Sequence, residues 1–184
     1  MKPTTLILDM DEIITDFVSA ACIVHGTTRD KLHSTWTPGD WDMCEPLDVS
    51  VTKFWAEIDE YGIEFWKGLH PTPWLEDLML FCEREFEEIH IVTAPSRSEH
   101  CYHGKVWWLR EYFGSTFNNF CITPHKHIFA NERSVILDDR ETTVKKFVEH
   151  GGKGILFPAF HNSLHVQRDN PLPYVFNEIL NLGD

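Results

Sequence analysis

Two aspartates near the start of the chain, Asp9 and Asp11, are the residues whose types and spacing point most directly to chemistry. They follow the apolar run Leu6-Ile7-Leu8, which predicts a short buried strand that delivers both acids to the carboxyl edge of a sheet. In an extended segment, residues two apart point to the same side, so both carboxylates can reach one ligand. A buried carboxylate pair is costly unless a cation or a chemical task compensates it. For these two residues alone, a strand end followed by a helix-capping aspartate is an equal alternative.

Further polar side chains follow later apolar runs or lie close to them. Thr93 ends one run, Asp138 and Asp139 end another, and Lys105 lies on the helix expected after Thr93. Because the carboxyl ends of parallel strands lie on one side of a sheet, we expect four carboxylates, a hydroxyl and an ammonium group to meet there. Oxygen ligands of this kind suit Mg²⁺. The sequence therefore predicts a magnesium site, although Asp138 and Asp139 taken alone are also typical of a helix cap.

The same residues supply the groups that phosphoryl transfer requires. A carboxylate can attack phosphorus and form an acyl phosphate, while a second carboxylate two residues away protonates the departing alkoxide. A lysine and a threonine hydroxyl stabilise the charge on the phosphoryl oxygens. The pattern thus favours an enzyme that acts on a phosphoester.

Short apolar runs alternate with helical patterns along most of the chain. Strands are expected near residues 6–8, 88–93, 119–123, 134–139 and 154–157. Helices are expected over residues 72–86, with Thr72 as N-cap, and over residues 98–113 and 141–149. A last helix is expected after Asn170, with the side chains of Val175, Ile179 and Leu180 facing the core. This alternation predicts a Rossmann-like three-layer α/β/α sandwich with a five-stranded parallel sheet.

Residues 18–70 have a different pattern from the rest of the chain. This stretch is too long for a simple crossover, and it contains loop signals together with Trp36, Trp41, Phe54, Trp55, Tyr61, Phe65 and Trp66. It predicts a small, mostly helical cap inserted above the active edge, with residues 1–17 and 71–184 forming the catalytic core. Most of these aromatic residues are expected only to hold the cap together.

Length and composition limit the classes of partner. The chain has 184 residues and a hydrophobic content of 42%, which fit one domain with an insertion. Its formal net charge of −13 disfavours long nucleic acids or an anionic membrane as partners. The five cysteines include no CxxC pair, and we expect a reducing, cytoplasmic location without a signal peptide or a membrane span. The eleven histidines follow no established zinc spacing. The sequence leaves open whether the chain forms a homodimer.

The motifs together resemble those of a known superfamily. Asp9-Met10-Asp11, Thr93, Lys105 and Asp138-Asp139 resemble, in order, the four motifs of the haloacid dehalogenase (HAD) phosphohydrolases. More narrowly, they resemble the 5'(3')-deoxyribonucleotidases, through additional matches in Asp16-Phe17, Ile91-Val92-Thr93-Ala94-Pro95, His100-Cys101, Gly104-Lys105, Trp108 and Ile136-Leu137. This second likeness covers the core and is weak in the cap.

The resemblance implies roles for the acidic residues. Asp9 is the implied nucleophile, and Asp11 is the implied general acid that later activates water. Mg²⁺ is implied to bind the carboxylates of Asp9 and Asp139 and the backbone carbonyl of Asp11. Asp138 is implied to orient the metal site or Lys105.

It also implies how the substrate binds. Thr93 and Lys105 bind the phosphoryl group, with Ala94 beside it, while Phe17 and Trp66 stack on a nucleobase.

Three departures from the family pattern bear on these roles. Glu12 stands where many members have glycine, and Ala94 stands where the nucleotidases have serine. The spacing from Thr93 to Lys105 is one residue shorter than the pattern, which leaves Lys126 as the alternative lysine of the third motif.

These observations favour a Mg²⁺-dependent phosphatase that hydrolyses nucleoside monophosphates, with deoxyribonucleotides preferred, through an aspartyl phosphate. One alternative is the same chemistry on another small phosphoester, such as a sugar phosphate. Another is a nucleotide-binding module without turnover. The preferred base, the sugar and the position of the phosphate, 5' or 3', stay open.

Overall fold

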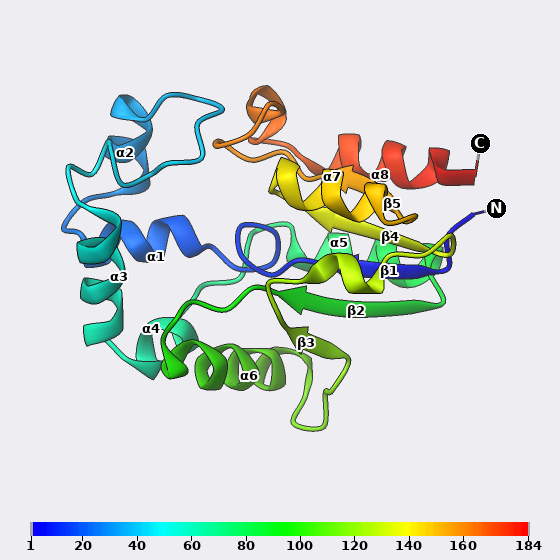
Figure 1. Ribbon diagram of the computed structural model, residues 1–184, viewed down its shortest axis with the longest axis horizontal. Helices are drawn as coiled ribbons and strands as arrows, with labels where there is room; N and C mark the ends of the chain where they lie inside the picture. Colours follow the sequence, from blue (N-terminus) through cyan, green and yellow to red (C-terminus); the bar gives the residue numbers. More distant parts are fainter. Residues whose placement is uncertain (1, 184) are drawn as a thin grey trace.

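The apolar runs of the sequence form one parallel sheet in the computed structural model, which describes residues 2–183 (Figure 1). Its five strands lie in the order β3-β2-β1-β4-β5. Their bounds are β1 Thr5–Leu8, β2 Glu88–Thr93, β3 Phe120–Ile122, β4 Ser134–Asp138 and β5 Lys153–Leu156. The predicted Rossmann-like sandwich with a five-stranded parallel sheet is confirmed, and no strand end differs from the expected one by more than one residue.

Strands β1 and β4 are neighbours at the centre of the sheet. Leu8 pairs with Leu137 in register, and the backbone N–H of Asp9 donates to the carbonyl of Leu137 at 3.0 Å. The two acidic segments that follow these strands therefore begin side by side. This adjacency follows from the strand order, because both strands are buried on both faces and end at the same edge.

Helices cover both faces of the sheet. The main helices of this part of the chain are α5 Leu75–Glu85, α6 Glu99–Phe113, α7 Glu141–Glu149 and α8 Leu172–Leu180, with the 3₁₀ helices η1 Lys126–Phe129, η2 His165–Gln167 and η3 Asn181–Gly183. Leu6 and Leu8 pack in the cluster that includes α5 and α8, whereas Ile7 packs against Phe147 of α7. Because successive strand residues point to opposite faces, α5 and α8 lie on one face and α7 on the other.

Two predictions about these helices are wrong in detail. Thr72 is not the N-cap of α5, which begins at Leu75, because its hydroxyl donates instead to the carbonyl of Ile13 at 2.8 Å. Leu180 does not face inward and is 57% exposed, although Val175 and Ile179 are fully buried as expected. Leu182 of η3 packs in the core instead, since the chain turns at the end of α8.

Four helices lie between the first two strands. They are α1 Phe17–Val24, α2 Arg29–Thr35, α3 Val51–Glu60 and α4 Ile63–Lys67. Polar side chains begin three of them, because Asp16, Thr28 and Ser50 each accept a backbone N–H of the first turn. Figure 1 shows α1, α2 and α3 beyond the carboxyl ends of the strands. Between residues 2 and 183, no helix combines the length and apolar character needed to cross a membrane.

Helix α4 packs closely on α6. A Cβ atom at Gly104 of α6 would lie 2.2 Å from the Cβ atom of Trp66, so only glycine permits this approach. The contact fixes Trp66 and the following segment relative to the helix that carries Lys105.

Candidate active site

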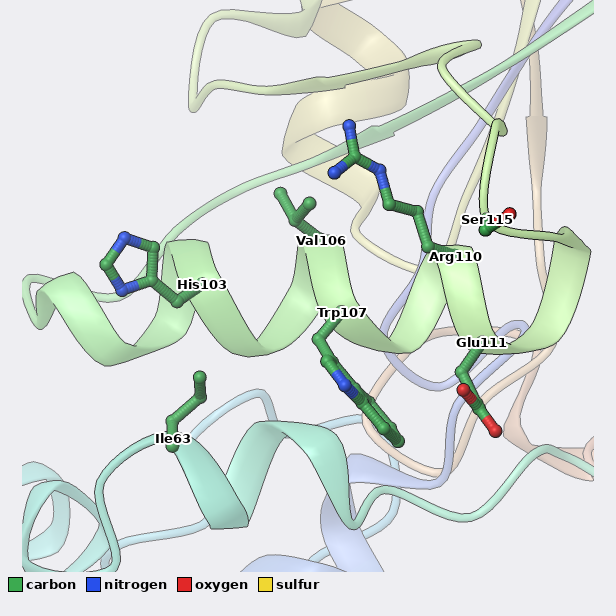
Figure 2. Close-up of a pocket in the computed structure, with 7 residues that line it drawn as sticks. All are labelled: Ile63, His103, Val106, Trp107, Arg110, Glu111 and Ser115. Atoms are coloured by element: carbon green, nitrogen blue, oxygen red, sulfur yellow. The ribbon is translucent and has the colours of Figure 1, made fainter.

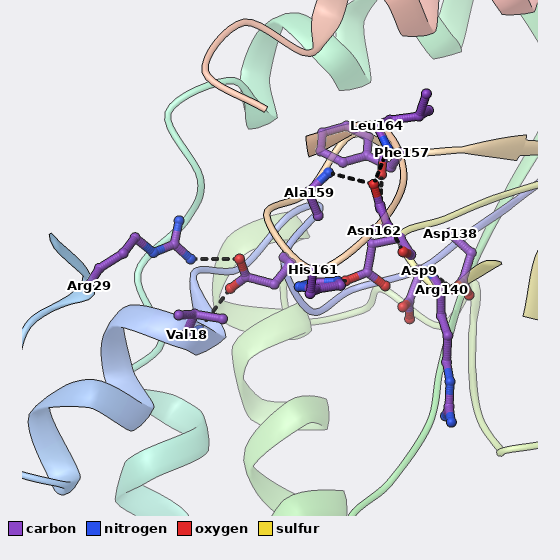
Figure 3. Close-up of polar contacts among 12 residues, drawn as sticks. Asp9, Val18, Arg29, Asp138, Arg140, Phe157, Ala159, His161, Asn162 and Leu164 are labelled. Carbon is purple, nitrogen blue, oxygen red and sulfur yellow. Dashed lines mark hydrogen bonds and ion pairs between the residues drawn. The ribbon is translucent and has the colours of Figure 1, made fainter. Parts of the chain in front are cut away.

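Three buried carboxylates meet at the carboxyl edge of the sheet. Asp9 follows β1, Asp138 ends β4 and Asp139 follows it. They are 8%, 1% and 4% exposed, respectively, and one oxygen atom from each lies within 4.8 Å of the others. Figure 3 shows Asp9 beside Asp138. The sequence-predicted acidic residues of the first and fourth motifs are thus brought together.

Lys126 is the cation of this cluster. Its Nζ lies 2.5 Å from Asp9 Oδ1 and 2.6 Å from Asp138 Oδ2, and its side chain is only 5% exposed. The other oxygen of Asp138 accepts the backbone N–H of Arg140 at 2.9 Å. Asp138 therefore contacts Lys126 and not Lys105, so the Lys105 role implied for it is wrong, while its role in orienting the metal site stays a prediction.

The cluster has more negative than positive charge. Burial raises the pKa of Asp9 to about 8, Lys126 opposes this rise, and Asp138 and Asp139 add to it. Burial also raises the pKa of Asp138, against the effect of Lys126. One ammonium group does not balance three buried carboxylates. A cluster of oxygen donors whose charge is only partly balanced fits a hard divalent cation.

Lys105 forms a second polar group beside the first. Its fully buried Nζ donates to Asp11 Oδ2 at 2.6 Å, to Thr93 Oγ1 at 2.7 Å and to the carbonyl of Ala94 at 3.0 Å. The structure therefore brings both lysines to the site, in different places. Lys126 comes from η1, which follows β3, whereas Lys105 comes from the first half of α6, which follows β2.

A cavity of about 590 Å³ lies over the acidic cluster. Its polar wall includes Asp9, Asp11, Lys126, Asp138 and Asp139, and Ala94 lines the cavity as well. Its apolar wall includes Phe17, Trp36, Trp41, Phe54, Trp55 and Trp66. Thr93 and Lys105 are fully buried beneath the polar wall, where Lys105 donates to Thr93 and holds Asp11 and Ala94.

The two aromatic residues predicted to contact substrate differ in exposure. Both line the cavity, and their rings stack at 5.9 Å with an interplanar angle of 27°. Phe17 is half-buried, whereas Trp66 is only 1% exposed and lies beneath Lys105 Nζ at 5.3 Å. Phe17 thus presents the more accessible ring, and Trp66 supports it from behind.

Trp41 was expected to be one of the aromatic residues that hold the cap together, but it is 50% exposed and lines the same cavity. The Arg140 guanidinium lies 4.7 Å from the centre of its ring. The sequence places this tryptophan in a loop just after the turn at 37–40, and that position was the signal that could have indicated its contact with the cavity.

Sequence reasoning missed His161 and Asn162. His161 Nε2 lies 2.8 Å from Asp139 Oδ2, and Asn162 Nδ2 donates at 2.8 Å to the backbone carbonyls of Asp139 and Phe157 (Figure 3). Burial acts to lower the pKa of His161, but the adjacent Asp139 carboxylate outweighs it and raises this pKa. Both residues follow β5, so their place after the last predicted strand was the signal that could have found them.

Glu12, the residue that departs from the family glycine, ties the acidic turn to the following helices. It adopts a positive φ of 61°, which a glycine would reach without strain. Its carboxylate accepts the N–H of Val18 at 2.8 Å and pairs with Arg29 Nη2 at 2.6 Å (Figure 3). Arg29 also pairs with Asp16 at 2.9 Å. The contacts of the side chain offset the backbone strain.

A separate cavity of about 440 Å³ lies between α4 and α6 (Figure 2). Its lining is mixed and consists of Ile63, His103, Val106, Trp107, Arg110, Glu111 and Ser115. It shares no lining residue with the cavity over the acidic cluster.

Comparison with known proteins shows similarity of fold to solved structures. No protein-family model matches the sequence, and no curated protein matches it. A HAD family hydrolase from Deinococcus radiodurans, solved with bound phosphate and sodium, has a TM-score of 0.56 at 11% identity, over 96% of this chain and 88% of that one.

Two further solved structures are similar. YfnB from Bacillus subtilis, named a HAD hydrolase and bound to magnesium, has a TM-score of 0.54 at 17% identity, over 85% of this chain and 87% of that one. CbbY from Rhodobacter sphaeroides in complex with phosphate has a TM-score of 0.53 at 12% identity, over 88% of each chain. At these identities the likeness concerns the fold, and the chain has the fold of the HAD hydrolases.

Proposed function

We propose that this protein is a Mg²⁺-dependent phosphatase that hydrolyses small phosphomonoesters through a phosphorylated Asp9. The observation that carries this proposal is the cluster of Asp9, Asp138, Asp139 and Lys126 at the bottom of a cavity, with Asp11 and Lys105 beside it. The fold shared with HAD hydrolases supports it. Neither Asp9 nor Asp11 is replaced, which argues against a binding module without turnover.

The chain's residues divide the reaction between them. An oxygen of Asp9 attacks phosphorus, the bond from phosphorus to the ester oxygen breaks, and the acid form of Asp11 gives that oxygen a proton. Asp11 then accepts a proton from a water molecule, whose oxygen attacks the phosphorus of the aspartyl phosphate and releases inorganic phosphate and Asp9. Lys126 stabilises negative charge near Asp9, and Lys105 holds Asp11 in place.

The metal belongs with the acidic cluster. We assign the carboxylates of Asp9 and Asp139 and the backbone carbonyl of Asp11 as its protein ligands. Both oxygens of Asp138 already contact Lys126 and the N–H of Arg140, so Asp138 acts on the site through these contacts. When bound, Mg²⁺ supplies positive charge that offsets the clustered carboxylates and the phosphoryl oxygens.

We propose nucleoside monophosphates, with deoxyribonucleotides preferred, as the substrates. The aromatic wall of the cavity, with the accessible ring of Phe17, supports this class because a nucleobase stacks on such rings. Residues 18–70 form the cap in this proposal, since they supply most of that wall. The net charge of −13 disfavours a polynucleotide.

The first test is phosphate release from a panel of 5'- and 3'-phosphorylated nucleosides, ribose 5-phosphate and phosphoglycolate. We expect deoxyribonucleoside monophosphates to be hydrolysed fastest, EDTA to stop the reaction and added Mg²⁺ to restore it. Turnover of ribose 5-phosphate or phosphoglycolate alone would retain the catalytic proposal and reject nucleotides as the substrates of this cavity. Mg²⁺ binding without turnover of any compound would reject both.

The ring of Phe17 provides a sharper test of base recognition. Phe17→Leu keeps an apolar side chain but removes the aromatic face, and base stacking is worth about 1–3 kcal/mol. We therefore expect KM for nucleoside monophosphates to rise roughly 5- to 140-fold and KM for ribose 5-phosphate to stay within about twofold.

The matched control is Phe65→Leu. Phe65 packs edge-on against Phe17 at 5.8 Å but does not line the cavity, so its substitution tests cap packing alone. Equal effects of the two substitutions on KM would contradict a direct contact between Phe17 and the base.

A sugar phosphate is the second candidate substrate. The similar protein CbbY from Rhodobacter sphaeroides has also been solved in complex with xylulose 1,5-bisphosphate. The same panel of compounds distinguishes the two classes, because ribose 5-phosphate lacks the base.

A further inference from the structure

We propose that His161 is a positioning residue for Asp139 and that it thereby sets the affinity of the acidic cluster for Mg²⁺. This inference rests on the proposed function, because it concerns the metal that the reaction uses. It names a residue that the catalytic steps above do not involve.

The contact between His161 and Asp139 is short and buried. Nε2 lies 2.8 Å from Asp139 Oδ2, and the side chains are 5% and 6% exposed. In the hydrogen-bonding pattern of residues 2–183, this is the one bond that the Asp139 carboxylate accepts. Lys126 contacts Asp9 and Asp138 but not Asp139, so His161 is the group that orients the third carboxylate.

The imidazole is itself held in place by aromatic rings. Trp41 packs edge-on against it at 4.7 Å, and Trp36 stacks on it at 6.0 Å with an angle of 27°. Both tryptophans come from the segment between α2 and α3. The ring orientation of His161 therefore depends on residues of the proposed cap.

The backbone of this loop is fixed as well. Asn162 donates to the carbonyls of Asp139 and Phe157, each at 2.8 Å. This crosslink joins the loop after β5 to the loop after β4, so His161 reaches Asp139 from a rigid support. Removing the imidazole N–H leaves Asp139 close to two like charges without a donor of its own.

The physical consequence concerns metal binding. A donor that orients a ligating carboxylate reduces the cost of bringing it into the position that the metal requires, and its loss typically lowers metal affinity 10- to 100-fold. His161 also lines the cavity beside Trp36 and Trp41, so Mg²⁺ affinity measured without substrate is the readout that isolates its effect on Asp139.

The experiment compares His161→Phe and His161→Gln with the wild-type protein. The phenylalanine keeps an aromatic ring between the tryptophans and removes the donor, whereas the glutamine restores an N–H that can reach Asp139. Titration calorimetry with Mg²⁺ alone measures affinity, and phosphate release at increasing Mg²⁺ measures the half-saturating concentration. For His161→Phe we expect affinity to fall about 10- to 100-fold, with kcat recovered within a few-fold at saturating Mg²⁺. We expect His161→Gln to bind more tightly than His161→Phe.

The matched control is His33→Phe. His33 stacks on Phe160 at 3.9 Å in the same aromatic group, but it does not touch the acidic cluster. We expect this variant to bind Mg²⁺ like the wild type, and thermal unfolding checks that each variant is folded. If His161→Phe does not fold, His161→Leu, which also lacks a donor, takes its place.

Wild-type Mg²⁺ affinity in the folded variant that lacks a donor would overturn the inference, and so would a His161→Gln affinity no higher than that of this variant. The Mg²⁺ titration needs no substrate, so it tests His161 even if the compound panel shows no turnover. Absence of turnover in the wild type would instead reject the proposed function.

Discussion

Asp9→Asn is expected to lower kcat on the preferred substrate by on the order of 10⁴-fold or more, because an amide does not provide the nucleophilic oxygen that forms the phosphoenzyme. The substitution keeps the shape of the side chain and replaces one of three clustered carboxyl groups by a neutral amide. Lys126 keeps its contact with Asp138. We therefore expect the variant to fold, with a Tm without Mg²⁺ at or above that of the wild type.

Steady-state phosphate release and thermal unfolding measure these two effects. Asp77→Asn on the exposed side of α5 is the control, because it makes the same chemical change far from the acidic cluster. Hydrolysis by Asp9→Asn at the wild-type rate would rule out a covalent intermediate on this residue. A Tm low enough to leave Asp9→Asn unfolded at the assay temperature would assign the loss of activity to folding instead.

Lys126→Met is expected to reduce the free energy of unfolding by about 3–5 kcal/mol when Mg²⁺ is absent, because removing one partner of a buried ion pair leaves the other charge uncompensated. Here two carboxylates, those of Asp9 and Asp138, lose their cation. Activity should fall roughly 10²- to 10³-fold even with saturating Mg²⁺, since the ammonium also stabilises charge near the reacting phosphoryl group.

Lys105→Met is the matched variant, because Lys105 is an equally buried lysine that contacts a different aspartate. The side chain of its partner Asp11 is 29% exposed, so water solvates the carboxylate when the ammonium is removed. We expect a smaller loss of stability than for Lys126→Met. Chemical denaturation with and without Mg²⁺ measures the difference, and a larger loss in Lys105→Met would show that Lys105 is the lysine that balances the cluster.

The sequence was sufficient for the sheet and for the acidic edge. Apolar runs predicted the strands, and their alternation with helices predicted parallel pairing, which places the residues after β1, β2 and β4 at one edge. The positions of Asp9, Thr93 and Asp138 follow from this rule alone, because strand direction decides where the ends lie.

Details that depend on local competition were harder to predict. Thr72 has the residue type and the position of an N-cap, but its hydroxyl bonds to Ile13, a residue distant in sequence. Leu180 is apolar and close to the core positions of α8, but the chain turns after it and Leu182 fills the core. In both cases a contact formed by folding replaced the one that local sequence favours.

By itself, the sequence determined the fold and the residue types available at its active edge, because hydrophobic periodicity is local and the alternation of strands with helices requires parallel pairing. Only the tertiary structure decided that Lys126 pairs with Asp9 while Lys105 holds Asp11, that His161 supports Asp139, and that Trp41 lies on the cavity. These contacts join segments far apart in the chain, and their distances depend on how η1, the loop after β5 and the helices before β2 pack together. Spacing along the chain carries no measure of that packing.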